Sequence, residues 1–162
     1  MFFDKINIEE IKIHKSKGQF YDVMIDDTNI EFWTPLLFIP FGVDRKFNNF
    51  FINFELDTEN DLLEYFFNFL VNIENKLIEL LGIERHQLNS QLRITKKNPM
   101  LYTKIINKND KILSIIKKEN GEFINFYKID KKISAKVKIY IDNIWHKNGH
   151  YYYKYKIKEL VI

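Results

Sequence analysis

Hydrophobic residues along this chain form two different patterns, and the first is typical of β-strands. Short stretches rich in aromatic and β-branched residues alternate with turn-forming residues, which favours extended structure. Pro35 and Pro40 cannot donate to a β-ladder, so the stretch that holds them is expected at a sheet edge or interrupted. The expected strands are Ile6–Ile13, Gln19–Asp26, Ile30–Phe41, Phe47–Leu56, Ser90–Lys96, Met100–Asn107, Lys111–Lys118 and the closing stretch Lys136–Leu160.

The second pattern, a regular spacing of apolar residues, predicts one long helix. Between Leu62 and Leu81, apolar residues recur three and four positions apart; Thr58 is the expected cap, and Gly82 the expected end. Strands, one helix, then more strands predict a mainly β fold, an OB-like Greek-key barrel with one long α-helix, with an α+β arrangement as the alternative. A parallel α/β fold does not fit, because helices are missing between the strands. Residues 1–162 are expected to form a single OB-like domain.

The closing stretch predicts a hairpin, and its loop length decides which side chains share a face. A two-residue Asn148-Gly149 turn would place Ile141 opposite Lys156 and mix apolar with charged groups on both faces. A three-residue loop, Lys147 to Gly149 with a bulge, sorts the faces better and is therefore expected. It pairs Ile141 with Tyr155, Ile139 with Ile157, Tyr140 with Lys156, Trp145 with Tyr151, Asn143 with Tyr153, Val137 with Glu159 and Lys138 with Lys158.

Like charges placed opposite each other cost stability, so the expected pairing of Lys138 with Lys158 suggests a polyanion lying across the ribbon. Lysines would hold phosphates and tyrosines would stack on bases, as single-strand binders do. The alternative is a half-buried hairpin whose outward lysines keep a sheet edge soluble. The candidate nucleic-acid-binding residues are Arg93, Lys96, Lys97, Tyr102, Lys104, Lys138, Tyr140, Tyr152, Lys154, Lys156 and Lys158.

Charge is distributed unequally along the chain. Residues 1–81 carry 7 basic and 15 acidic side chains, whereas residues 82–162 carry 18 basic and 7 acidic ones. This asymmetry favours a polyanionic partner for the second half, or attraction between the two halves within the fold or across a dimer. The chain has no Cys, which fits a reducing intracellular location, and no stretch is long and apolar enough to span a membrane.

Catalytic and metal-binding patterns are weak. His146 and His150 lie four apart, but across a turn and without a convincing third ligand, so no metal site is expected. The chain has no P-loop, no G-x-G-x-x-G and no G-x-S-x-G. The sequence therefore predicts a protein that is not an enzyme and needs no cofactor.

Several stretches together resemble a known family. They are "IPFG" (residues 39–42), "FNNFFINFEL", the helix ending "NIENKLIELLG", "LRITKKNPMLYTKI", and an aliphatic strand reaching Trp145 followed by the hairpin and Lys154, Lys156 and Lys158. In this order they resemble the single-stranded DNA-binding replication proteins of large DNA viruses and of the tailed-phage type. The resemblance implies an OB barrel with an added helix that coats unwound DNA through basic and aromatic groups. Phage-type members end in an acidic tail, whereas this chain ends "KIKELVI".

Two alternative functions are therefore consistent with the sequence. The first is a non-catalytic single-stranded DNA-binding protein of replication, with RNA as an alternative ligand, replication proteins as further partners, and the cytoplasm or a viral replication site as its location. The second is a structural or assembly subunit of a viral or plasmid-encoded complex, in which acidic and basic halves of neighbouring copies meet. Both allow a homo-oligomer.

Overall fold

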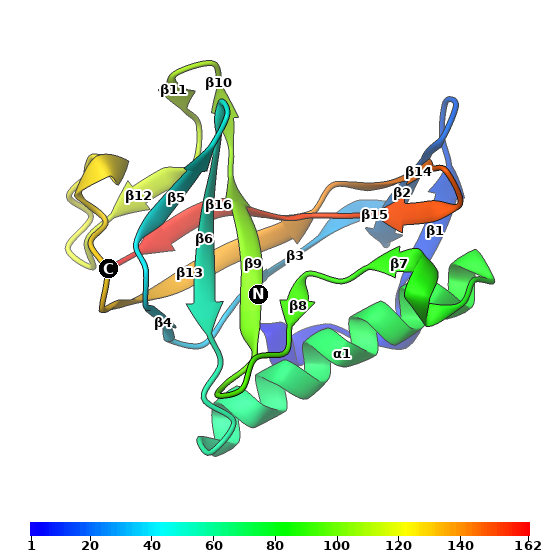
Figure 1. The fold of residues 1–162 in the computed structure, drawn as a ribbon, viewed down its shortest axis with the longest axis horizontal. Helices are drawn as coiled ribbons and strands as arrows, with labels where there is room; N and C mark the ends of the chain where they lie inside the picture. Colours follow the sequence, from blue (N-terminus) through cyan, green and yellow to red (C-terminus); the bar gives the residue numbers. More distant parts are fainter.

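A closed barrel of five strands forms the centre of the protein in the computed structural model, which describes all 162 residues. The barrel strands are β4 (Leu37–Ile39), β6 (Asn49–Glu55), β9 (Met100–Ile105), β13 (Ile133–Ile141) and β16 (Tyr155–Val161). Each pairs with its neighbour, and β13 pairs with β16 to close the ring; only the contact between β9 and β16 is parallel. The mainly β class with one long helix is thus confirmed (Figure 1).

One barrel wall is divided in two, as the prolines predicted. Strand β3 (Thr28–Trp33) pairs with the second half of β13, and β4 pairs with its first half. Between β3 and β4 lie Thr34 and Pro35, where the Thr34 amide still donates to the Val137 carbonyl at 2.8 Å. Pro35 therefore interrupts the strand without leaving the backbone unpaired.

The remaining strands extend or decorate the barrel. A second set of paired strands runs from β3 through β2 (Phe20–Ile25) to β14 (Asn143–Lys147), β15 (His150–Tyr152) and β7 (Leu88–Asn89), with β1 (Lys12–Lys15) on β2. The shorter elements are β5 (Val43–Lys46) on β6, β8 (Leu92–Arg93) on β9, β12 (Ile115–Lys117) on β16, and the separate hairpin of β10 (Asn107–Lys108) and β11 (Lys111–Ile112).

Helix α1 (Asp61–Leu81) lies along one side of the barrel (Figure 1). Its cap is Asn60 and not the expected Thr58: the Asn60 side chain accepts hydrogen bonds from the amides of Leu62 and Leu63. Gly82 ends the helix with a left-handed backbone (φ 63°), as predicted. Leu62, the first residue of the expected apolar stripe, is 48% exposed, whereas Leu63 and Phe66 pack against the core.

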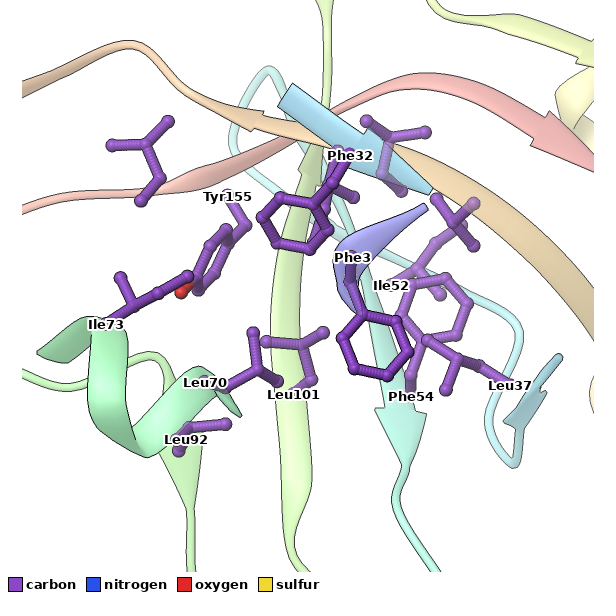
Figure 2. Close-up of a cluster of buried hydrophobic side chains, with 14 of the residues drawn as sticks. Phe3, Phe32, Leu37, Ile52, Phe54, Leu70, Ile73, Leu92, Leu101 and Tyr155 are labelled. Atoms are coloured by element: carbon purple, nitrogen blue, oxygen red, sulfur yellow. The ribbon is translucent and has the colours of Figure 1, made fainter. Parts of the chain in front are cut away.

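Aromatic and aliphatic side chains from the helix and the barrel form the core (Figure 2). Phe3 packs against Phe66 with ring centroids 4.8 Å apart, and Phe32 packs edge-on against Phe69 at 5.1 Å. Phe3 belongs to a short 3₁₀ turn, Phe3–Lys5, and a second turn covers Ile8–Glu10. The strand expected over Ile6–Ile13 is therefore wrong for most of its length, because these residues wrap the helix instead of entering the sheet.

The closing hairpin corrects the expected register. Asn148 and Gly149 both have a left-handed backbone (φ 53° and 76°), and Lys147 pairs with His150 and Trp145 with Tyr152. The turn therefore has two residues and not three, so the expected pairs Trp145–Tyr151 and Asn143–Tyr153 are wrong. Asn-Gly is the sequence that a tight hairpin turn of this type prefers, and this local preference wins.

Beyond the turn the chain is irregular, and part of the expected pairing returns. Around Asp142 and Lys154 the strands break, after which Ile141 lies opposite Tyr155, Tyr140 opposite Lys156 and Ile139 opposite Ile157, as expected. A further irregularity follows at Lys138, which lies opposite Glu159 and not Lys158; Val137 accordingly faces Leu160. The predicted repulsion between opposed Lys138 and Lys158 is therefore absent.

Candidate nucleic-acid interface

A row of side chains crosses the outer surface of the barrel. Residues directly opposite each other on paired strands project from the same face, and alternate residues point to the other face. Phe50, Ile52 and Ile105 point into the core, so their sequence neighbours point outward. The successive partners on β6, β9, β16, β13 and β3 are Phe51, Lys104, Lys156, Tyr140 and Glu31.

The most basic part of this surface surrounds Tyr102, which lies on the same face of β9 as Lys104. Tyr102 stacks almost flat on Phe51, with ring centroids 4.9 Å apart and an interplanar angle of 12°. Three cations lie around the Tyr102 ring, at 4.2 Å (Arg93), 5.3 Å (Lys154) and 5.8 Å (Lys46) from its centroid. We call the six residues Lys46, Phe51, Arg93, Tyr102, Lys104 and Lys154 the Tyr102 cluster.

The cations of the Tyr102 cluster are not neutralised. No carboxylate oxygen lies within 4.0 Å of any of them, although Asp44 stands opposite Phe51 on β5. Burial, together with the charges of Arg93, Lys104 and Lys46, lowers the pKa of Lys154. Burial and the charge of Lys156, its cross-strand partner, lower the pKa of Lys104. The fold thus concentrates positive charge here at a cost to its own stability.

Repulsion between opposed lysines was expected on the closing hairpin and is found on another strand pair. Lys104 on β9 and Lys156 on β16 are direct partners in the parallel pairing. The sequence could not reveal this contact, because the two strands are 50 residues apart and their register depends on the closed barrel.

The buried side chain of Glu74 on helix α1 fixes the segment that leads to Arg93. This segment also contacts Lys154, through Gln91. Glu74, 2% exposed, accepts hydrogen bonds from the Ser90 hydroxyl (2.6 Å), the Gln91 amide (3.2 Å) and the Tyr153 hydroxyl (2.6 Å). Gln91 in turn accepts a hydrogen bond from the Lys154 ammonium group at 3.4 Å. The helix therefore positions two cations of the cluster through the hydrogen bonds of one buried side chain.

The three remaining candidate lysines of the closing strands are paired with acids. Lys138 and Lys158 share Glu31, with N–O distances of 3.6 and 2.6 Å, and Lys156 contacts Asp142 at 2.8 Å. Burial alone would raise the pKa of Glu31, but the hydrogen bond from Lys158 and the charge of Lys138 hold this pKa below its usual value. The surface on which all these lysines were expected to bind phosphates thus divides into a neutralised part and the unpaired Tyr102 cluster.

The other candidate residues lie at the margins of this surface or outside the cluster. Lys96 and Lys97 are exposed in the connection between β8 and β9, where they line a hollow with Phe41. Tyr140 is half-buried beside Glu31, and burial followed by the charges of Asp142 and Glu31 raises its pKa. Tyr152 stacks on Trp145 at 5.6 Å in the β14–β15 hairpin.

Sequence reasoning missed Lys46 and Phe51 as members of the cluster. Phe51 does carry a signal: it is an apolar residue at an outward position of an alternating strand. Lys46 carries none, because it reaches Tyr102 only through the pairing of β5 with β6 and of β6 with β9.

None of the helices combines the length and the apolar character that crossing a bilayer requires. No group of three or more His, Asp or Glu side chains comes together in the geometry of a metal site.

Comparison with known proteins identifies the fold. No family model and no curated protein matches the sequence. Among solved structures, the chain is similar to the single-stranded DNA-binding protein gp2.5 encoded by bacteriophage T7, with a TM-score of 0.59 and 8% identity over 82% of this chain and 90% of that one.

It is also similar to the single-stranded DNA-binding protein of bacteriophage Enc34 in a C-terminally truncated form (TM-score 0.58, 6% identity, 94% of this chain and 92% of that one). A structure of that phage protein in complex with single-stranded DNA matches with a TM-score of 0.52 and 7% identity over 94% of each chain. The fold resemblance expected from the sequence is thereby confirmed.

Proposed function

We propose that this protein binds single-stranded DNA without sequence preference and without catalysis, and that it coats unwound DNA during replication. The observation that carries the proposal is the Tyr102 cluster: four cations without acidic partners around two stacked aromatic rings, on the outer surface of a barrel. Phosphates neutralise such cations, and nucleobases stack on such rings. The fold shared with phage single-stranded DNA-binding proteins supports the same proposal.

Binding would rearrange the cluster. Tyr102 is only 6% exposed in the free protein, because Phe51 and its cations cover it. A phosphate attracts Arg93 and Lys154 more strongly than an aromatic ring does, so these side chains would turn outward and uncover the tyrosine for a base. In this scheme the free protein keeps its stacking surface covered until the polyanion arrives.

The first test measures anisotropy of a labelled oligothymidylate as protein is added, at several salt concentrations. Replacing Lys104 and Lys154 together by Gln should weaken binding and make its salt dependence less steep by about 1.4 in the log–log slope, at about 0.7 per phosphate contact. Lys118→Gln is the control, since Lys118 is paired with Glu122 away from the cluster. Equal binding by the double variant and the wild type would refute the proposed site, and duplex and RNA competitors would establish the ligand.

The assembly-subunit alternative has one observation in its favour. The stretch from Leu113 to Tyr127 exposes four large apolar side chains that line one hollow together, namely Leu113, Ile115, Phe123 and Tyr127, and grouped apolar side chains of this kind are typical of protein contacts. Light scattering with and without oligonucleotide distinguishes the two functions. A fixed oligomer that does not bind the oligonucleotide would favour assembly.

A further inference from the structure

Phe47 occupies an unusual position at the tip of the hairpin that joins β5 and β6. Lys46 pairs with Asn49, so Phe47 and Asn48 form a two-residue turn. The Phe47 backbone is left-handed (φ 58°), a conformation that costs free energy for any residue except glycine. Its side chain is 94% exposed and gains nothing from the core in return. Both features are unfavourable for folding, which marks the position as a candidate for function.

The tip is nevertheless held in place by hydrogen bonds. Arg45 Nε donates to the Phe47 carbonyl at 3.1 Å. Asn107 Nδ2, from the neighbouring β10–β11 hairpin, donates to the Asn48 carbonyl at 2.8 Å and to the Asn109 carbonyl at 2.7 Å. The two hairpin tips therefore lie side by side (Figure 1). Phe47 is presented on a braced turn, so its ring needs little further ordering to receive a ligand.

The surroundings of Phe47 carry excess positive charge. The two hairpins bear Arg45, Lys46, Lys108 and Lys111, against Asp44 and Asp110, and none of these cations has a carboxylate within 4.0 Å. Lys46 also belongs to the Tyr102 cluster, because its ammonium group lies over the Tyr102 ring. The exposed phenylalanine thus stands at the edge of the same cationic surface.

We propose that Phe47 is a second nucleobase-stacking residue, at which a single strand bound to the Tyr102 cluster continues over the β5–β6 turn. This inference rests on the proposed function and extends it. Four residues of strand separate Phe51 from Phe47, which is about 13 Å at roughly 3.3 Å per residue. That distance falls within the length of strand that barrels of this kind bind, about 4–16 nucleotides. Excess cations around the ring favour a base attached to phosphates over an apolar pocket of another protein.

Phe47→Gly provides a test in which stability and affinity should change in opposite directions. Glycine adopts the left-handed backbone without strain, so the free energy of unfolding measured with urea should stay equal or rise. Affinity for an oligothymidylate of about fifteen nucleotides should fall about 5- to 150-fold, the equivalent of one lost stacking contact.

Two further variants complete the design. Phe47→Trp should retain affinity and add tryptophan emission that is quenched by the long oligonucleotide beyond the quenching seen with Trp33 and Trp145 alone. Tyr65→Ala removes an aromatic side chain that is 56% exposed on helix α1, far from the two hairpins (Figure 1), and should leave affinity unchanged.

The outcomes separate the two proposals. If the wild type does not bind single strands, the proposed function fails. If the wild type binds and Phe47→Gly binds the long oligonucleotide equally well, only the present inference fails. A loss of stability in Phe47→Gly would also overturn it, because the side chain would then serve folding.

Discussion

Glu31→Gln should strengthen DNA binding, because Glu31 neutralises two lysines of the barrel surface. Its carboxylate contacts Lys158 at 2.6 Å and Lys138 at 3.6 Å. In the wild type a phosphate must compete with this carboxylate for either lysine. The Gln amide oxygen can still accept one hydrogen bond but carries no charge, so both cations become available.

The size of the effect follows from counting cations. The Tyr102 cluster supplies four unpaired cations, which predicts a log–log salt slope of about −2.8, and adding Lys138 and Lys158 predicts about −4.2. Other lysines, such as Lys96, contribute equally to the slopes of the wild type and of Glu31→Gln, so the difference of about −1.4 does not depend on them. Fluorescence anisotropy at four or more salt concentrations measures both slopes.

A matched control separates the release of lysines from a simple change of net charge. Glu122→Gln removes the same charge but frees only Lys118, on an exposed segment after β12. If Glu31→Gln and Glu122→Gln give the same slope, the reasoning about the shared carboxylate is refuted. A slope in Glu31→Gln that is less steep than the wild type would refute it as well.

Three further outcomes follow from the geometry. Lys104→Gln should raise the free energy of unfolding, measured in urea titrations, by about 0.2–1 kcal/mol, because it removes the repulsion from its cross-strand partner Lys156. The same variant should bind single strands more weakly. A lower free energy of unfolding would contradict the prediction. Glu74→Leu should lower the free energy of unfolding by about 2–4 kcal/mol, because the Tyr153 hydroxyl and the Gln91 amide lose a buried acceptor. Glu79→Leu, on the exposed face of the helix, should lower it far less. Burial and neighbouring cations lower the pKa of Lys154 below 10.5, so between the two pKa values the unfolded chain binds more protons than the folded protein. In that pH window the free energy of unfolding should rise with pH, while affinity for DNA falls. Lys154→Gln should remove this part of both pH dependences.

Much of the fold could be predicted from local patterns. Stretches rich in aromatic and β-branched residues between turn signals marked the barrel strands, and a three-and-four spacing ending at Gly82 marked helix α1, because burial of one helix face imposes this period. The first residues were misjudged because Ile6–Ile13 has the composition of a strand but is held against the helix in 3₁₀ turns. Local propensity does not reveal such a tertiary contact.

In the closing hairpin, the preference for an apolar and a charged face led to the wrong turn length, although the local Asn-Gly sequence indicated the right one. Asn-Gly favoured the two-residue turn, but a continuous ribbon with that turn would have mixed apolar and charged faces. The chain satisfies both demands by breaking the strands near Asp142 and Lys154, which restores the apolar pairing of Ile139 with Ile157. The expected register assumed two continuous strands, so it could not predict this interruption.

The sequence by itself determined which stretches form the barrel strands, where the helix ends and that the second half of the chain is basic, since these depend on residues close together along the chain. Only the tertiary structure decided which cations are free. Lys138, Lys156 and Lys158 look equivalent to Lys104 and Lys154 in the sequence, yet Glu31 and Asp142 neutralise the first three. The reason is physical: the charge available to a ligand depends on which carboxylates lie within a few ångströms, and strand pairing across the closed barrel sets those distances.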